Sequence, residues 1–452
     1  MSSKQSRFAD PILLICGAIG MLVSSAMACS TLHGRGALGC EILALVCWAG
    51  VSLLLLRYPL FGLRHTVCAI AGLYLCVQFR LSFFDYISPD YVSFLGPWTD
   101  TMRNMSVPQA LRTPIGDYNM PYLYLLLLIS RLPLYDLYCI KLISVLADLF
   151  LALAAAKLVR LTVRRDGLVL AAFFGALLAP TVFLNSAYWG QCDGVYACFA
   201  LWGLYFGLKK RPVRAMILLA LAFSFKLQAI FILPVAAFLL VREYLEPKHL
   251  AVFPGAFIGI MFPALLAGRS LSNTFGIYLD QTNAYPYLSL KAPSFWSLIP
   301  NDYFSNLAVP SVLLAGTVTL LLLYLFLQHP EHLAVSDLMD LALLFSLAIP
   351  WLLPRMHERY FYLAEILSVV YAACHPRRLP VTLILLGGGF LIYCSYLFGG
   401  MRILSTELLA ALYGLTLIYL TLTLYRQISS RIINHSPSKE ETHHEKTGNP
   451  LE

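Results

Sequence analysis

The chain has 452 residues, of which 59% are hydrophobic and 12% are charged, and its mean hydropathy is +0.73. Soluble domains are about a quarter charged, so this composition excludes an ordinary soluble enzyme. We assign the net charge of +8 to cytoplasmic loops and contact with anionic lipids, and expect no nucleic-acid partner. Apolar runs of about 18–20 residues recur and are long enough to cross a bilayer, which predicts an all-α polytopic membrane protein.

Basic residues in short loops predict which ends of the spans face the cytoplasm. The basic clusters are Lys4/Arg7, Arg57/Arg64, Lys157–Arg165, Lys209–Arg214, Arg242/Lys248 and Arg377/Arg378. The predicted spans are 11–29, 38–56, 65–82, 137–158, 168–185, 193–208, 213–225, 228–241, 250–268, 304–327, 338–353, 359–374, 380–398 and 403–425. We therefore expect about fourteen spans, in a range of about 11–14, with both termini in the cytoplasm.

Three segments depart from this simple alternation. Met120–Pro133 is apolar but short, and a crossing there would put the basic stretch after Lys157 outside, so we expect a re-entrant or juxtamembrane helix. Residues 213–241 are interpreted as two short spans with Lys226 at the bend. The segment "QHPEHLAVSD" is expected in the cytoplasm although it is net acidic.

Residues 1–425 are expected to form one membrane domain, and residues 426–452 a disordered cytoplasmic tail. In that tail, His443 and His444 are interpreted as solvated residues in preference to metal ligands. The cysteines lie mostly in apolar runs and form no CxxC pair, which indicates neither a disulfide framework nor a zinc site.

Carboxylates, cations and aromatic side chains gather in the loops expected on the external face. The first long loop, 83–119, carries Asp85, Asp90 and Asp100, and a second long loop covers 270–303. Two shorter segments, "NSAYWGQCDG" and "PRMHERYFY", are also rich in polar and aromatic residues. Ionisable side chains are costly near a membrane, so this cluster is a functional-site hypothesis.

The order of these motifs resembles the GT-C class of integral-membrane glycosyltransferases. The motifs are the acidic loop, "GDYNMPYLYLLLL", "WGQCDGVY", "FSFKLQAIFILP", "YPYLSLKAPSFW" and "MHERYFY", and the likeness runs from about Phe83 to Pro376. The nearest likeness is to bacterial relatives of the mannosyltransferase that adds the second mannose to GPI anchors. The resemblance implies a GT-C-like helical bundle in a bacterial plasma (inner) membrane, with its active site on the external face.

The resemblance also implies the reaction. Such enzymes transfer a hexose, with mannose favoured, from a polyprenyl-phosphate donor to a hydroxyl of a glycan, glycolipid or protein in cell-envelope glycan biosynthesis. A carboxylate of the first external loop acts as general base in a single inverting displacement. No cofactor or metal site is recognised in the sequence, and a divalent cation at Asp90 and Asp100 stays open.

Asp90 is the favoured general base, because it follows Pro89, which restricts the local backbone, and because it sits where the resembling family carries its loop acid. Asp100 is the second candidate and Asp85 the third. For Asp85, we prefer the simpler interpretation that it ends a span at the interface. A positioned general base typically contributes about 10²–10⁴-fold to the rate.

Arg355, His357 and Arg359 are the candidates for binding the donor phosphate. If the segment is helical, Arg355 and Arg359 share one face at the i,i+4 spacing, and Glu358 can pair with one of them. The alternative is that the arginines are interfacial anchors with their heads in water. Lys226 fits phosphate binding and anchoring about equally.

Trp189, Gln191 and Asp193 are candidates for binding the sugar or acceptor, because such groups stack on sugar rings or bond to hydroxyls. The alternative is an aromatic belt plus a helix N-cap, with Asp193 capping the span that begins near Gly194. Tyr118 joins the candidates, although it and Tyr122 also fit a structural role. Asp148, inside an apolar run, is expected to pair with Arg80 or another span.

Two other protein classes compete with the enzyme. A transporter or flippase of lipid-linked sugars would also need many spans and buried cations, but it commonly shows internal repeats, and none is clear here. A non-catalytic membrane scaffold is the third class. ATP-driven chemistry is not indicated, because the sequence has no GxxxxGK[ST] loop.

Overall fold

The computed structural model describes residues 32, 36–400 and 403–435. The predicted span 11–29 and the two tail histidines lie outside these residues. The prediction of an all-α protein is confirmed for the described part, whose only strands are β1 (Ser289–Leu290) and β2 (Met356–His357). The helices before residue 210 are α2 (Ala37–Arg57), α3 (Leu63–Leu81), α4 (Gly96–Arg103), α5 (Val107–Arg112), α6 (Met120–Ile129), α7 (Asp136–Arg160), α8 (Asp166–Leu177), α9 (Pro180–Phe183) and α10 (Asp193–Leu208).

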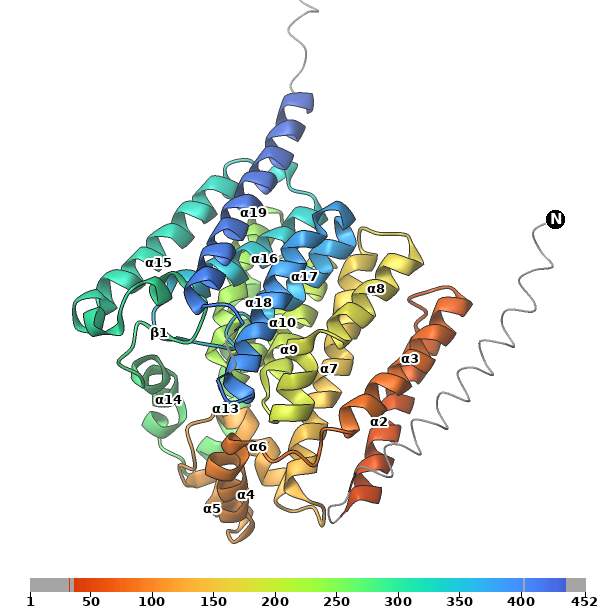
Figure 1. Cartoon of the computed structure of the whole chain (residues 1–452), viewed down its shortest axis with the longest axis vertical. Helices are drawn as coiled ribbons and strands as arrows, with labels where there is room; N and C mark the ends of the chain where they lie inside the picture. Colours follow the sequence, from red (N-terminus) through yellow and green to blue (C-terminus); the bar gives the residue numbers. More distant parts are fainter. Residues whose placement is uncertain (1–31, 33–35, 401–402, 436–452) are drawn as a thin grey trace, which may run out of the picture.

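The second part of the chain continues the same bundle (Figure 1). Its helices are α11 (Pro212–Phe225), α12 (Val235–Val241), α13 (Val252–Leu266), α14 (Leu271–Asn283), α15 (Phe304–Leu327), α16 (Val335–Leu352), α17 (Tyr362–Cys374), α18 (Leu379–Leu397) and α19 (Thr406–His435). Short π- and 3-10-helical stretches join some of them, including the π-helical η2 (Leu184–Trp189) and the 3-10-helical η3 (Leu227–Ile232). α19 continues to His435, past the expected end of the last span at 425.

The predicted count of about fourteen spans is wrong. Among the described residues, eight helical segments are long and apolar enough to cross a membrane. They are Ala37–Arg57, Asp136–Arg160, Asp166–Trp189, Pro247–Leu266, Asn301–Leu327, Val335–Leu352, Pro376–Leu397 and Thr406–Ile433. Four shorter apolar segments have 10–17 residues: Met120–Ile129, Pro212–Phe225, Leu227–Val241 and Tyr362–Cys374.

The prediction counted too many membrane spans, and the reason is physical. A helix rises about 1.5 Å per residue, so a segment of 10–17 residues falls short of a hydrocarbon core about 30 Å thick. Such a segment can be apolar because it is packed among other helices, and α17 is buried along nearly its whole length. α6, where a re-entrant or juxtamembrane helix was predicted, has only 10 residues and is mostly buried.

The loops predicted to be cytoplasmic lie together at one end of the bundle. The Arg160 side chain donates to the Leu60 carbonyl at 3.0 Å, and Arg242 donates to the Glu331 carbonyl at 3.0 Å. The acidic loop that broke the charge rule also receives Arg431, which pairs with Asp337. Its acidic character is therefore matched by a basic residue from α19.

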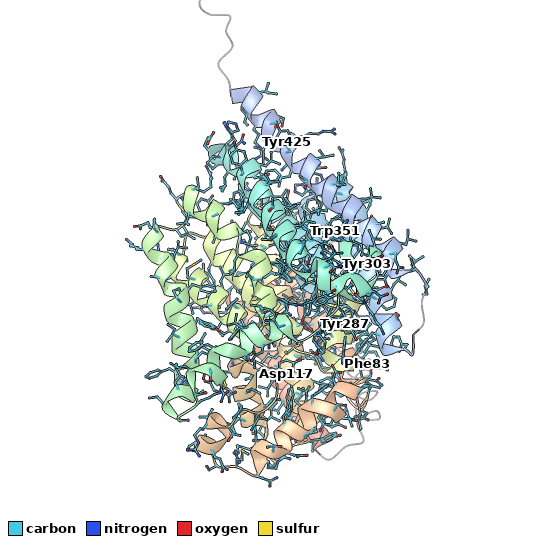
Figure 2. The ribbon with its side chains drawn as sticks, turned by 90° about the vertical axis from the view of Figure 1, so that its left-hand side faces the viewer. Phe83, Asp117, Tyr287, Tyr303, Trp351 and Tyr425 are labelled. Atoms are coloured by element: carbon cyan, nitrogen blue, oxygen red, sulfur yellow. The ribbon has the colours of Figure 1, made fainter. Side chains whose placement is uncertain are left out.

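The first long loop lies toward the other end. Figure 1 shows α4 and α5 at the end of the molecule opposite the C-terminal end of α19, and Figure 2 shows Phe83 and Asp117 well below Tyr425. The loop is largely helical, with a π-helical turn at Tyr91–Leu95 followed by α4 and α5. The bundle thus has a basic end and an end at which the candidate site residues gather.

The predicted pairing of Asp148 with Arg80 is confirmed. Arg80 Nε donates to Asp148 Oδ2 at 3.2 Å, and both side chains are 0% exposed. Ser186 Oγ donates to the same carboxylate oxygen at 2.6 Å. We call Arg80 and Asp148 the core pair; it joins α3 to α7 and to η2.

Candidate functional site

Two neighbouring cavities lie in front of the segment before α17: η3 and α14 line the larger one, and the loop from Asp90 to α4 lines the smaller one. The larger has a volume of about 820 Å³ and the smaller about 330 Å³. They share a wall of five residues: Asp117, Tyr118, Tyr285, His357 and Arg359. Nearly all of the predicted site residues line one or both cavities or contact a residue that does.

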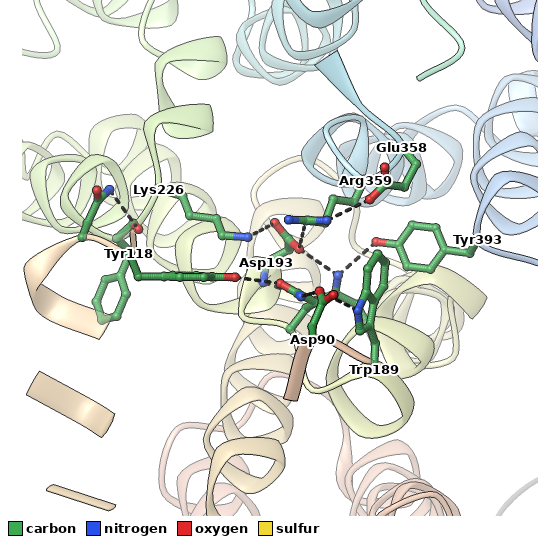
Figure 3. A network of polar contacts seen from close by, with 12 residues as sticks. Asp90, Tyr118, Trp189, Asp193, Lys226, Glu358, Arg359 and Tyr393 are labelled. Carbon is green, nitrogen blue, oxygen red and sulfur yellow. Dashed lines mark hydrogen bonds and ion pairs between the residues drawn. The ribbon is translucent and has the colours of Figure 1, made fainter. Parts of the chain in front are cut away.

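Asp90 lines the smaller cavity and is fixed by two neutral donors. Trp189 Nε1 donates to Asp90 Oδ2 at 2.9 Å, and Gln191 Nε2 donates to the same oxygen at 2.5 Å (Figure 3). The other carboxylate oxygen, Oδ1, receives no hydrogen bond from the residues that the structure describes. The half-buried carboxylate therefore has a fixed direction and one oxygen available for a ligand.

The two donors reach one oxygen because of the turn between them. Gly190 ends η2 with a φ of 81°, in the left-handed region that glycine adopts most readily. The backbone N–H of Gln191 then bonds the Asn185 carbonyl at 2.8 Å. This turn brings Trp189 and Gln191 to the same side, so an L-residue at Gly190 would strain the support of Asp90.

Lys141 fixes the chain that leads to Asp90, and the sequence analysis missed it. Its Nζ donates to the carbonyls of Phe83 at 2.9 Å, Phe84 at 3.0 Å and Tyr86 at 2.7 Å. An ammonium has three donors, so all of its donors are used on this one turn. A lysine within the predicted span 137–158 was the signal that could have indicated it.

Asp193 is the centre of a buried charge network. Its Oδ1 accepts from Lys226 Nζ at 2.7 Å, its Oδ2 accepts from Asn185 Nδ2 at 2.8 Å, and Arg359 Nε lies 3.6 Å from Oδ2. We call Asp193, Lys226, Glu358 and Arg359 the cavity network (Figure 3). α10 begins at Asp193 itself and its side chain caps no backbone group there, so the N-cap interpretation is wrong.

Arg359 also pairs with Glu358, as the sequence analysis expected for one of the arginines. The distance from Arg359 Nη1 to Glu358 Oε1 is 2.8 Å. Burial alone would lower the pKa of Arg359, but the carboxylates of Glu358 and Asp193 raise it well above its usual range. Burial would raise the pKa of Glu358, but the neighbouring His357 and the charge of Arg359 lower it. Both side chains are therefore charged near neutral pH.

The expectation of a helical i,i+4 spacing for Arg355 and Arg359 is wrong. Arg355 has a φ of 64°, and the next two residues form β2, which pairs in parallel with β1. Arg355 donates to Asn283 Oδ1 at 3.0 Å and lies 5.0 Å from the Phe304 ring centre. Both arginines nevertheless line the larger cavity, together with Lys226 and His357. The Nε atoms of both arginines are buried and have no hydrogen-bond acceptor among the described residues.

Trp189 supports the site and offers no face to a sugar. Its side chain is 0% exposed, Tyr396 stacks on it with ring centres 4.6 Å apart, and the Arg359 guanidinium lies 5.2 Å from its ring centre. Because Trp189 is buried, it also cannot belong to an aromatic belt in contact with lipid. Its N–H instead contacts Asp90 and its ring contacts Arg359.

Tyr118 connects the two cavities through hydrogen bonding. Its hydroxyl donates to Gln191 Oε1 at 2.9 Å, and Gln191 in turn donates to Asp90. Lys226 Nζ lies 5.8 Å from the Tyr118 ring centre. Tyr122, which packs against Tyr118, is buried and has the structural position expected of it.

Asp100 and Asp85 lie apart from the cavities. Asp100 is 68% exposed in its side chain and pairs with Arg103 at 2.7 Å. Asp85 accepts a hydrogen bond from Tyr138 near the end of α3. Neither residue belongs to the lining of the two cavities, so the structure does not bring Asp100 together with Asp90 to hold a cation.

Several site residues were not singled out from the sequence. Asn185, which holds Asp193, and Tyr393, whose hydroxyl accepts from Asn185 at 3.0 Å, are buried polar groups within helices. Tyr396, which stacks on Trp189, was likewise not singled out. The signal for Asn185 was an amide within an apolar run, but the other residues stand out only once the helices are packed.

The residues that line the two cavities suit two different chemical tasks. The free oxygen of Asp90 can accept a proton in the smaller cavity, while the cations along the larger cavity can stabilise an anion. The two functions lie on either side of a shared wall. Across the whole chain, no protein-family model and no curated protein sequence gives a match.

Proposed function

We propose that this chain is a GT-C-class membrane glycosyltransferase, which transfers a hexose, with mannose favoured, from a polyprenyl-phosphate donor to an acceptor hydroxyl. One observation carries the proposal: a fixed carboxylate faces one cavity, the side chains of Lys226, Arg355 and Arg359 together with His357 face its neighbour, and the two cavities share a wall. The order of motifs from the acidic loop to "MHERYFY" adds the support of a family resemblance.

The larger cavity is assigned to the donor. Lys226, Arg355, His357 and Arg359 line it, and cations of this kind form strong hydrogen bonds with phosphate oxygens. Its lining also includes the apolar side chains of Ile230 and Val312, which are 42% and 48% exposed. Exposed apolar side chains beside the phosphate-binding cations suit a donor whose prenyl tail lies in the bilayer.

The smaller cavity is assigned to the acceptor hydroxyl. Asp90 Oδ1 takes the hydroxyl proton as the acceptor oxygen forms its bond to the anomeric carbon of the sugar. The bond from that carbon to the phosphate oxygen breaks, and its electron pair leaves with the lipid phosphate. The cations of the larger cavity stabilise this charge, and attack from the side opposite the phosphate inverts the anomeric centre.

The proposal also includes the side of the membrane on which the reaction takes place. The site lies at the end of the bundle away from the basic loops, and basic loops face the cytoplasm in most membrane proteins. The reaction is therefore assigned to the external face of a bacterial plasma membrane. A transporter of lipid-linked sugars could use the same cations, but it would not need a carboxylate positioned to take the proton of an acceptor hydroxyl.

The test uses the purified protein in nanodiscs with a panel of polyprenyl-phosphate sugars and a cell-envelope extract as the source of acceptors. Release of polyprenyl phosphate and labelled product is measured. Asp90→Asn is expected to lower turnover by about 10²–10⁴-fold, because it removes the base but keeps the size of the side chain.

Asp100→Asn is the matched control, since it makes the same change in the same loop outside both cavities, and near-normal turnover is expected. Wild-type turnover in Asp90→Asn would refute the assignment of the base. Transfer of an intact donor across the membrane without cleavage would favour the transporter instead.

A further inference from the structure

Lys291 is a cation that the reaction outlined above does not use. It follows β1 directly, pairs with His357 through an isolated bridge, and lines the smaller cavity together with Asp90. Its φ is 61°, in the left-handed region that few non-glycine residues adopt. Such a conformation persists where the surrounding structure imposes it, and it often occurs at ligand sites.

The backbone around Lys291 is held from both sides. β1 pairs with β2, and Asn301 Oδ1 accepts from the backbone N–H of Leu288 at 2.7 Å and of Ser289 at 3.1 Å. Ser289 Oγ in turn donates to the Ala292 carbonyl at 3.0 Å. The backbone position of Lys291 is thus held by hydrogen bonds on both sides.

Lys291 differs from the other cationic groups of the smaller cavity in its pairing. Arg359 pairs with Glu358 and Asp193, and His357 lies 3.7 Å from Glu358. Lys291 makes no ion pair among the described residues; its Nζ lies 5.8 Å from the Tyr396 ring centre. The smaller cavity therefore contains one ammonium group whose charge is available to a ligand.

Lys291 could bind either the donor or the acceptor, and its position favours the acceptor. It is not part of the lining of the larger cavity, where the donor phosphate is assigned to Lys226, Arg355, Arg359 and His357. It shares the smaller cavity with Asp90, whose charge would repel an anionic acceptor unless a cation offset it. The volume of about 330 Å³ equals that of about ten waters, which is enough for a sugar ring bearing one phosphate.

We propose that the acceptor is a phosphate ester, and that Lys291 binds its phosphate while Asp90 takes the proton from a nearby hydroxyl. This inference rests on the proposed glycosyl transfer and adds to it the chemical class of the acceptor. The phosphate can belong to a lipid headgroup or to a water-soluble sugar phosphate, because both present the same charged group to the ammonium.

The test follows transfer of labelled sugar from the donor to two acceptor fractions, an organic-solvent lipid extract and an aqueous extract of the cell envelope. The labelled product is expected to bind an anion-exchange resin and to lose that binding after chemical cleavage of its phosphate ester. The fraction that yields the product shows whether the phosphate is on a lipid or on a soluble molecule.

Variants of Lys291 then test whether this residue binds the phosphate of the acceptor. Lys291→Gln is expected to raise the KM for the acceptor by about 10- to 100-fold and to leave the KM for the donor unchanged, whereas Lys291→Arg keeps most of the affinity. Lys248→Gln, at an exposed lysine paired with Glu246, is the control for a general loss of positive charge. Unfolding midpoints of all three variants separate a binding defect from a folding defect.

Two results would overturn the inference. One is a labelled product that carries no negative charge, and the other is a raised donor KM in Lys291→Gln with an unchanged acceptor KM. Either result leaves the proposed function standing, because transfer still occurs. Failure of the wild-type protein to release polyprenyl phosphate from any donor would instead count against the proposed function itself.

Discussion

The core pair and the cavity network are two groups of buried charges with different surroundings. In the core pair, Arg80 and Asp148 are both 0% exposed. In the cavity network, Asp193 is 1% exposed, but Lys226 is 9% and Arg359 is 17% exposed, and both line the larger cavity. Burial of charge is common to both groups, so burial does not identify a functional site. The two groups differ instead in the access of their cations to a cavity.

The largest expected effect concerns the core pair. Arg80→Met leaves the Asp148 carboxylate buried without a cation, which typically costs about 3–5 kcal/mol of unfolding free energy. We expect a lower unfolding midpoint with little change in kcat per folded molecule. Arg80→Met combined with Asp148→Leu should recover much of the stability, because no charge is then left unpaired. A selective loss of kcat in Arg80→Met would remove the distinction between the two groups.

A substitution in the cavity network should weaken donor binding more than it lowers the stability of the protein. Arg359→Gln removes a charged partner from the assigned phosphate site, and each such hydrogen bond contributes about 1.5–3 kcal/mol. Initial-rate kinetics should show the donor KM raised by about 10- to 100-fold, with a smaller change in stability. Arg160→Gln, at the basic end of the bundle, is the matched control and should leave the donor KM unchanged. Wild-type donor kinetics in Arg359→Gln would assign Arg359 to anchoring.

A smaller effect is expected from pH through Glu358. Its pKa is lowered in the folded protein, so its contribution to stability is fully present above the unfolded value and is lost as the pH falls through the folded value. The unfolding midpoint should therefore drop below about pH 4, the usual range of a glutamate. In Glu358→Gln this part of the acid dependence should be absent. An unchanged acid profile in that variant would mean that Glu358 does not stabilise the network.

The smallest effect is predicted for Asp100, which lies in neither charge group. Its pair with Arg103 is on the surface, and such pairs contribute about 0–1 kcal/mol. Asp100→Asn should shift the unfolding midpoint only slightly in thermal or denaturant unfolding. A loss comparable to that of Arg80→Met would show that the loop depends on this surface pair.

Much of the site could be expected from the sequence because polar residues are rare in this chain. In so apolar a sequence, an acid such as Asp90 or a lysine at a helix break such as Lys226 stands out. The pairing of Arg80 with Asp148 follows from the cost of an unpaired charge in an apolar bundle, and it is confirmed. Residue types alone therefore indicated which side chains needed partners.

The partners themselves could seldom be predicted. Lys226 and Asp193 are 33 residues apart, and only the packing of the helices decides such a contact. The span count failed because the sequence pattern cannot tell a helix packed against helices from one packed against lipid. The helical spacing assumed for Arg355 and Arg359 failed because β1, from a distant part of the chain, pairs with β2.

The proposed base and the cations assigned to the phosphate are synthesised at different times. Asp90 and the two side chains that orient it all precede Cys192, whereas His357 and Arg359 follow more than half of the remaining chain. Polypeptides fold progressively as the ribosome extends them. A nascent chain that ends within α15 therefore already has its base but lacks the arginines that would retain a phosphate. We expect the growing protein to be inert toward its substrates until α17 has been inserted.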